Sequence, residues 1–466
     1  SSANPKFVDC TFTENEAFNA QLTTTIMAAG IQQLETRQYM PGGAFYLDLD
    51  CTLSLDRCEI TRNIGSSAVW LEAYDVVDVN ECVFSLNEAN AQYVSRSDSL
   101  TVDGQVRSLP GTYWDMFCGG AMDIGPYCSD VRIKNSQFYS NTAAGDGGAI
   151  RLMSDADFIG CAFSGNKAGG NGGAIEAFFD TGDPQNPYEL QLTFDGCSFG
   201  GNEAVNGFHG FGGALHFEAF DARINDCYFL NNRAKSGGAM FLTAGTVKLT
   251  GGSVSGNIST GGSGVAPPAD TDLDAALGGT LDDSGLQAQA NVYYFHRGSF
   301  SKESPGVGVD IGGGVVCAAT NAAFESCMFS NNRAEGLQGT GGALSFYGGY
   351  VDHLVKNCMF TDNFASYQGG AISSGLFASP VITNSTFAEN TAERLGGAIY
   401  CDWDSDVTVG DSIFQKNTNV AIAEIDFGNS IATHSLFYDN PGGDYAMYDS
   451  ATKKLHKVAG GELDVT

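Results

Sequence analysis

Three carboxylates in the last fifth of the sequence have the spacing of a candidate metal site. Asp402, Asp404 and Asp406 occupy positions i, i+2 and i+4. Alternate residues of an extended chain share one face, so this spacing would place three carboxylates on one outward strip. Solvated charge is the favoured interpretation of the strip. Calcium, which binds clustered carboxylate oxygens, is the alternative, and no other cofactor is expected.

Thirteen cysteines form a second set of reactive side chains. Eight of them stand two residues before a repeated apolar residue, so by strand parity they share its inward face and should stack as a column of buried thiols. Oxidation between neighbouring members, such as Cys197 and Cys227, is the alternative, because the strand spacing falls within disulfide range. The predicted column contains Cys161, Cys197, Cys227, Cys327 and Cys358.

Three pairs of cysteines lie close together in the sequence and could cross-link loops, and two of these pairs include one of the eight. The candidate disulfides are Cys51 with Cys58, Cys118 with Cys128, and Cys317 with Cys327. Such bridges are typical of an oxidising, extracellular compartment. Two Asn-x-Ser/Thr patterns, at Asn257 and Asn384, are candidate N-glycosylation sites.

The elements that position these side chains follow from one repeated pattern. An aromatic residue is followed three positions later by Asn, and then by a Gly-Gly-Ala-apolar tetrad. Thirteen copies of the first motif, with Ile60/Asn63 and Val254/Asn257 as degenerate ones, and nine of the tetrad span the chain. The unit is about 24 residues long, which suits one turn of a solenoid.

Each repeat unit alternates apolar and polar residues in the manner of β-strands. The run from Val131 to Lys134 precedes the motif at Phe138, and Ile150 and Leu152 flank Arg151 after a tetrad. This period of two predicts strands, and the Asn and Gly between them favour tight corners. Three short strands per unit predict an all-β fold, a parallel β-helix of about 13 coils.

The repeated Asn has an architectural interpretation. Placed at the same corner of every coil, its amide can bond the backbone and the Asn side chains above and below, and we do not expect it to bind a ligand. The predicted structural ladder contains Asn141, Asn166, Asn202, Asn232, Asn332, Asn363 and Asn390.

The two motifs, Gly-Gly-Ala-Ile and Phe-x-x-Asn, resemble the repeats of the chlamydial polymorphic outer-membrane proteins. The resemblance extends from about residue 7 to residue 440. It implies a right-handed parallel β-helix like that of autotransporter passenger domains, displayed on a cell surface and involved in adhesion.

The repeat also defines the expected domain organisation. Residues 1–440 form the β-helix, and residues 441–466, with Lys453, Lys454 and Lys457, form a C-terminal cap or assembly segment. The large insertions all fall between the Asn corner and the Gly-Gly corner, so they should emerge from one edge of the solenoid and supply its binding face. They comprise residues 18–41, 88–117, 203–211 and 258–312.

The net charge of the chain restricts the classes of partner that it can bind. With 54 acidic and 23 basic residues the net charge is −31, which would repel nucleic acid and anionic lipid surfaces. No apolar run is long enough for direct membrane insertion. We expect other copies of the chain, neighbouring surface proteins or glycans as partners. The sequence begins at Ser1 without Met and without a leader, so either a signal peptide has been removed or the chain is a segment of a longer protein; we expect a secreted protein, extracellular or at the cell surface, whose leader has been removed.

These observations predict a non-enzymatic extracellular structural or adhesive protein, a scaffold that presents loops, or a subunit of a filament. The alternative is a polysaccharide lyase or glycoside hydrolase on the same fold. Such an enzyme needs outward carboxylates with Arg or Lys along adjacent coils, and the sequence pattern indicates no such cluster. His216 with Glu218 has outward parity, but one such pair is usually surface.

Overall fold

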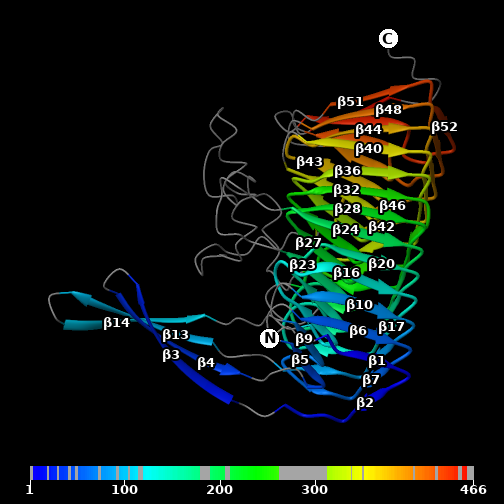
Figure 1. The fold of residues 1–466 in the computed structure, drawn as a ribbon. Helices are drawn as coiled ribbons and strands as arrows, with labels where there is room; N and C mark the ends of the chain where they lie inside the picture. Colours follow the sequence, from blue (N-terminus) through cyan, green and yellow to red (C-terminus); the bar gives the residue numbers. More distant parts are fainter. Residues whose placement is uncertain are drawn as a thin grey trace.

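The computed structural model shows one elongated solenoid of stacked coils, with the termini at opposite ends (Figure 1). Four parallel sheets run along it, and a fifth, antiparallel sheet stands beside its N-terminal end. The described residues are 4–17, 20–28, 31–39, 43–47, 51–71, 75–90, 94–102, 105–113, 119–178, 189–204, 210–261, 312–336, 338–348, 351–401, 405–425, 429–449 and 454–458.

Sheets A and B each contain thirteen strands, one from every coil. Sheet A consists of β1 (Lys6–Val8), β6 (Thr52–Asp56), β10 (Val76–Asn80), β16 (Ser129–Lys134), β20 (Ala156–Ile159), β24 (Leu190–Asp195), β28 (Phe220–Asn225), β32 (Thr246–Thr250), β36 (Asn321–Glu325), β40 (Asp352–Lys356), β44 (Ser379–Thr383), β48 (Asp406–Gly410) and β51 (Asn429–Thr433). Sheet B consists of β2 (Thr11–Thr13), β7 (Glu59–Thr61), β11 (Val83–Ser85), β17 (Gln137–Tyr139), β21 (Ala162–Ser164), β25 (Ser198–Gly200), β29 (Tyr228–Leu230), β33 (Ser253–Ser255), β37 (Met328–Ser330), β41 (Met359–Thr361), β45 (Thr386–Ala388), β49 (Ile413–Gln415) and β52 (Leu436–Tyr438). The predicted solenoid of about 13 coils is therefore confirmed.

Sheets C and E complete the coil. Sheet C, of two-residue strands that follow the repeated Asn, consists of β8 (Ile64–Gly65), β12 (Glu88–Ala89), β18 (Thr142–Ala143), β22 (Lys167–Ala168), β26 (Glu203–Ala204), β30 (Arg233–Ala234), β34 (Ile258–Ser259), β38 (Arg333–Ala334), β42 (Phe364–Ala365) and β46 (Thr391–Ala392). Sheet E consists of β5 (Phe45–Leu47), β9 (Val69–Leu71), β15 (Met122–Ile124), β19 (Ile150–Leu152), β23 (Ile175–Phe178), β27 (Leu215–Glu218), β31 (Met240–Thr243), β35 (Val315–Ala318), β39 (Leu344–Tyr347), β43 (Ile372–Gly375), β47 (Ile399–Cys401), β50 (Ile422–Ile425), β53 (Tyr445–Asp449) and β54 (Lys454–Val458). A typical coil thus has four strands where the sequence pattern predicted three, because a two-residue strand shows no periodicity.

The interior is a set of stacked side-chain columns. Phe138 and Phe163 stack with ring centroids 4.8 Å apart, and Phe163 and Phe199 stack at 4.9 Å. These distances equal the spacing of neighbouring strands, so identical residues in successive coils meet face to face. The burial of one continuous core, from Leu47 to Ala432, therefore follows directly from the repeat.

The tetrad glycines form a tightly packed corner, which Ser66-Ser67 and Asn419-Val420 occupy in two of the coils. The first glycine has a left-handed backbone, with φ of +66° at Gly212. The second approaches the next coil closely, since a Cβ on Gly213 would lie 2.0 Å from the carbonyl oxygen of Gly238. Gly312 and Gly313 have the same geometry, so Gly312-Gly313-Gly314-Val315 is a tenth tetrad that the search for Gly-Gly-Ala missed.

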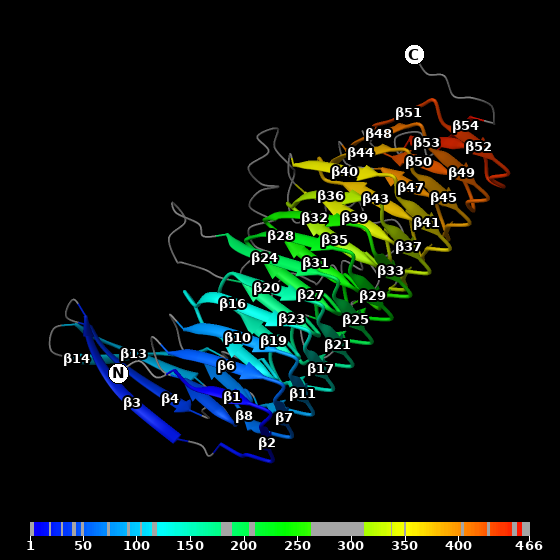
Figure 2. The ribbon, with the colours of Figure 1, turned by 45° about the vertical axis from the view of Figure 1, so that its right-hand side comes forward.

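Two of the predicted insertions form antiparallel hairpins. One consists of β3 (Ala20–Ala28) and β4 (Ile31–Tyr39), and the other of β13 (Val94–Val102) and β14 (Gln105–Tyr113). β4 pairs antiparallel with β13, which joins the hairpins into sheet D, in the order β14, β13, β4, β3. Sheet D projects from the N-terminal half of the solenoid (Figure 2).

The segment after residue 440 continues sheet E before it reverses. β53 pairs parallel with β50, as the strands of the other coils do. β54 then returns antiparallel along β53 and ends the sheet. Within the described residues, sheets A and B end at β51 and β52 without such a returning strand.

Candidate functional site

The repeated Asn side chains form a continuous hydrogen-bonded column from Asn15 to Asn440. Asn232 shows the pattern: its backbone N–H and its Nδ2 both donate to Oδ1 of Asn257, each at 2.9 Å, and its Nδ2 also donates to the carbonyl of Phe199 at 3.0 Å. The buried ladder residues that repeat this pattern include all those predicted: Asn141, Asn166, Asn202, Asn232, Asn332, Asn363 and Asn390. The hydrogen bonds of each amide are made to the backbone and to neighbouring Asn side chains, so the amide has none left for a ligand.

Of the two glycosylation candidates, Asn257 belongs to the Asn ladder and Asn384 does not. Asn257 is fully buried and its Nδ2 donates to Asn332 Oδ1 at 3.0 Å, so the expectation of a glycan at Asn257 does not fit the folded chain. Asn384 lies at an exposed corner with φ of +49°, and glycosylation there stays a prediction.

The cysteines of the predicted column are buried thiols on one inward face. Cys197 is fully buried, and its backbone N–H donates to the sulfur of Cys227 at 3.3 Å. The Cys327 thiol donates to the carbonyl of Glu325 at 3.1 Å. Burial raises the pKa of Cys82 to about 11, which keeps that thiol protonated and unreactive at neutral pH. The column comprises Cys161, Cys197, Cys227, Cys327 and Cys358.

The predicted disulfides are not found. Cys58, Cys128, Cys317 and Cys327 are all free thiols, so no bridge joins Cys51 to Cys58 or Cys317 to Cys327. Cys118, the expected partner of Cys128, lies outside the described residues. Cys58 and Cys327 belong to the inward column, where backbone carbonyls accept hydrogen bonds from their thiols, and this geometry explains why proximity in sequence was misleading.

The candidate calcium strip is only partly described. Asp406 is exposed at the start of β48, whereas Asp402 and Asp404 lie outside the described residues. Among the described residues, no group of three or more His, Cys, Asp or Glu side chains is arranged to hold a metal ion. Calcium binding by these three aspartates stays a prediction.

A row of charged side chains on the outer face of sheet E was missed by the sequence analysis. Strand register places Asp123, Arg151, Glu176 and His216 side by side on four successive coils. Arg151 donates to both carboxylate oxygens of Asp123, at 3.0 and 2.9 Å, and His216 Nδ1 lies 2.7 Å from Glu176 Oε2. In the sequence, the residue directly after the tetrad is Asp, Arg, Glu and His in these four coils, and this pattern could have indicated the row.

The expectation that His216 lies at the surface is wrong. His216 is only 6% exposed and Glu176 only 4%. Burial raises the pKa of Glu176 to about 7, although the facing imidazole opposes this shift. Burial alone would lower the pKa of His216, but the charge and hydrogen bond of Glu176 raise it above its usual value. The protonation of each group therefore depends on that of the other.

This row has the residue types of acid–base catalysis but not its accessibility. Asp123 is 1% exposed, and Phe211 stacks on Phe241 beside His216 with ring centroids 4.6 Å apart. A polysaccharide chain would have to reach the carboxyl of Glu176, which the surrounding atoms cover. Buried, mutually paired charges of this kind favour one register of the coils over others. We therefore interpret the row as a structural feature that fixes the register between these four coils.

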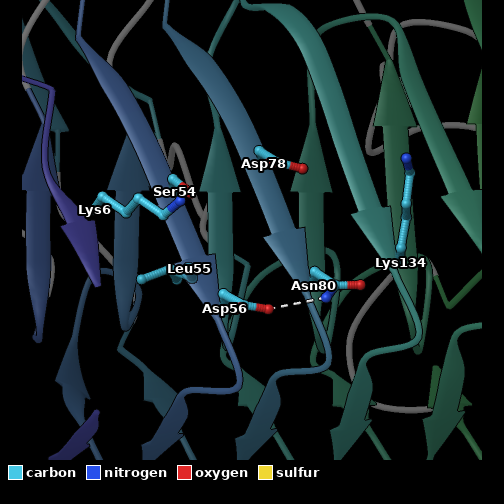
Figure 3. Close-up of a pocket in the computed structure, with 7 residues that line it drawn as sticks. All are labelled: Lys6, Ser54, Leu55, Asp56, Asp78, Asn80 and Lys134. Carbon is cyan, nitrogen blue, oxygen red and sulfur yellow. Dashed lines mark hydrogen bonds between the residues drawn. The ribbon is translucent and has the colours of Figure 1, made fainter. Parts of the chain in front are cut away.

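A shallow hollow of about 290 Å³ lies on the outer face of sheet A in the first coils (Figure 3). Lys6 and Lys134 stand at its two ends with Asp56 and Asp78 between them, and Asn80 Nδ2 donates to Asp56 Oδ1 at 2.9 Å. Two cations and two carboxylates balance, so the hollow has no net charge to attract an ionic ligand.

Comparison with known families agrees with this geometry. Residues 302–457 match the family described as right handed beta helix region. Residues 135–152 and 160–177 match the Chlamydia polymorphic membrane protein repeat, each with one Phe-x-x-Asn motif and one tetrad. Comparison with curated proteins and with solved structures gives no significant match.

The fold and the comparisons together define the class of the chain. It is an all-β, right-handed parallel β-helix repeat protein. More narrowly, it carries repeats of the chlamydial polymorphic membrane protein type. In the described part of the chain, no helix is of sufficient length and apolar character to cross a bilayer.

Proposed function

We propose that the chain is a non-enzymatic extracellular scaffold that presents its inserted segments to a neighbouring protein or glycan at a cell surface. The observation that carries this proposal is sheet D. Two insertions that are separated by about two coils of sequence pair through β4 and β13, from Val94↔Arg37 to Ser99↔Gln32. A pairing of this length gives the inserted segments a common structure outside the solenoid, as a presented binding element requires.

The hydrogen bonding within the solenoid supports a structural, non-enzymatic role. Its hydrogen-bonding groups are used within the coils, as the Asn ladder and the Asp123–Arg151 pair illustrate. The repeats match a membrane-protein repeat, which supports display at a surface. Fold alone does not determine function, so the proposal rests on the projecting sheet and on the inaccessibility of the charged row.

The test compares the full chain with a variant in which residues 20–39 and 94–113 are replaced by short turns. We expect glycan-array or cell-surface binding by the full chain and its loss in the variant, with the thermal unfolding midpoint of the solenoid unchanged. Equal binding by both chains would exclude sheet D as the binding element.

The charged row on sheet E favours one second candidate, a polysaccharide lyase or hydrolase. Glu176 and His216 are close enough for proton transfer, and Arg151 lies on the neighbouring strand. A reducing-end assay on bound polysaccharides separates the two functions. Turnover that is lost in Glu176→Gln, while an outward Asp157→Asn control keeps it, would establish the enzyme and overturn the scaffold proposal.

A further inference from the structure

Cys197 and Cys227 lie next to each other on successive coils, at the corner between sheets A and B. Cys197 directly precedes β25 and Cys227 directly precedes β29, and these two strands pair in register (Figure 2). The rings of Phe199 and Phe229, two residues further along each strand, stack with centroids 4.8 Å apart, which measures the distance between the two coils. Both cysteines are buried. The pair is therefore two thiols that lie one strand spacing apart at the edge of the core.

The two sulfurs have the same orientation. The Cys197 thiol donates to the carbonyl of Asp195, two residues earlier, at 3.6 Å. The Cys227 thiol donates to the carbonyl of Asn225, also two residues earlier, at 3.2 Å. Side chains of one orientation on strands in register repeat at the strand spacing, so the two sulfurs lie about 4.8 Å apart. The backbone N–H of Cys197 also donates to the Cys227 sulfur at 3.3 Å.

Cys197 ionises more readily than its neighbours. Hydrogen bonds from the thiols of Cys161 and Cys227, on the coils to either side, lower the pKa of Cys197 below its usual value, although burial opposes this shift. The contact with Cys197 and burial both raise the pKa of Cys227. An ionised pair therefore consists of one thiolate, at Cys197, beside one neutral thiol.

We propose that Cys197 and Cys227 bind one soft monovalent cation, Cu(I), between their two sulfurs. Soft thiolate ligands select Cu(I), whereas hard cations such as calcium require oxygen ligands. A metal–thiolate bond is about 2.3 Å long, as for zinc, so two opposite bonds span about 4.6 Å, which matches the spacing of the sulfurs. Cu(I) accepts linear coordination, so two donors are sufficient.

The charge balance of the site favours a monovalent ion. On binding, the cation takes the place of the Cys197 thiol proton, which leaves to solvent, and the Cys227 sulfur donates a lone pair. The complex of one cation, one thiolate and one thiol is neutral. A neutral site avoids the cost of an uncompensated charge in the core.

The corner outside this pair is open to a small ion. Corner side chains lean over the next coil, as at Gly160, where an added Cβ would lie 2.9 Å from the amide oxygen of Asn135. Gly160 has no side chain to lean over the coil that follows, and a Cβ on Gly196 would meet nothing within 4 Å. Asp195 and Asp226 are exposed beside the opening, where their carboxylates attract cations.

Other neighbouring cysteines of the column lie behind corners that carry side chains. Arg57 precedes Cys58, and Asn357 precedes Cys358. The Arg57 guanidinium also repels a cation. The open corner at Gly196 therefore distinguishes the Cys197–Cys227 pair from these thiols.

The test offers Cu(I), as its bathocuproine disulfonate complex under argon, to the folded full chain. Cys10, which is partly exposed, and Cys118 are replaced by Ser in every chain so that neither takes up copper. We expect one ion per chain, with a sulfur-to-copper charge-transfer absorption in the ultraviolet. Affinity should fall at least about 100-fold in Cys197→Ser, because the loss of a ligand costs more than the roughly 10–100-fold cost of losing a ligand's hydrogen-bond partner.

Cys317→Ser is the matched control. Cys317 is equally buried, but its register neighbours are Leu242 and Phe346, so this variant should bind copper as the parent chain does. Ser136 and Ser385 occupy the column position in other coils, so Cys197→Ser should fold, which circular dichroism and unfolding midpoints verify. Failure of the parent chain to take copper from the chelator would overturn the proposal. So would binding that Cys197→Ser leaves unchanged or that Cys317→Ser abolishes, because either result places the ion elsewhere.

Discussion

Asn440 Nδ2 donates a hydrogen bond to Asp444 Oδ1 at 3.2 Å, at the position where every earlier ladder Asn donates to the Asn of the next coil. The carboxylate of Asp444 replaces the amide oxygen that a further coil would supply. β54 likewise closes sheet E with an antiparallel strand. At this end the solenoid therefore contains residues that terminate its own repeat.

The ladder should contribute much more to stability than other Asn residues do. Asn232→Ala leaves the Asn202 amide groups and the Phe199 carbonyl without their partner inside the core. We expect the free energy of unfolding to fall by about 3 kcal/mol, since buried unpaired groups cost about 1–3 kcal/mol each. Denaturant titration measures this loss. Asn225→Ala, at an outward position of β28, is the control and should cost less than about 0.5 kcal/mol. Equal losses would contradict the ladder's role.

Gly213, at the second position of its tetrad, is required by space and not by flexibility. In Gly213→Ala the new methyl group would lie 2.0 Å from the Gly238 carbonyl oxygen and 2.6 Å from the Arg233 nitrogen. Both are backbone atoms, so two coils must separate, and we expect a loss of at least about 3 kcal/mol. Gly200→Ala, where nothing lies within 4 Å, should be neutral or slightly stabilising. Thermal unfolding of the two variants makes the comparison, and similar midpoints would refute it.

His353 should make the solenoid sensitive to acid. Its ring is 2% exposed, lies 4.4 Å from the Phe346 ring, and neither ring nitrogen has a hydrogen-bond partner. Burial lowers the pKa of His353 to about 4, below its value of about 6.5 in an unfolded chain. The unfolded state then binds the proton more readily, so stability is complete above about pH 6.5 and falls as the pH drops towards 4.

The expected loss attributable to His353 is about 3 kcal/mol across that range, from about 1.4 kcal/mol for each pH unit. Chemical denaturation at about pH 7 and about pH 4.5 measures it. His353→Leu should reduce the difference between the two pH values by about 2 kcal/mol or more. The same pH dependence in the variant and in the wild type would assign the acid sensitivity to other groups, such as the Glu176–His216 pair.

Thiol labelling should separate Cys10 from the column. Cys10 lies in the first coil and is only partly buried, whereas the other cysteines among the described residues are buried. We expect a maleimide to label Cys10 within minutes in the native protein and the others only after unfolding, because a buried thiol is not accessible to the reagent. Peptide mapping by mass spectrometry identifies the labelled sites, and Cys10→Ser should abolish the fast phase. Rapid labelling of Cys197 would show that the column opens.

Much of the solenoid was predictable because its repeat acts locally. The Phe and Asn motifs fix which side chains point inward, and stacking then follows from the strand spacing, as the 4.8 Å contact between Phe138 and Phe163 shows. The tenth tetrad at Gly312 was missed because Gly314 replaces the usual Ala. The two-residue strands were missed because they are too short to show a period.

Contacts between coils were decided by the tertiary structure. Glu176 and His216 are 40 residues apart in the sequence, and an insertion separates them, so only the register of β23 and β27 brings them together. The same holds for Asn257, which fits a glycosylation pattern in the sequence but is buried in the ladder. Sequence determines the parity of each strand and thus the fold, whereas the register between coils decides which side chains meet and which become buried.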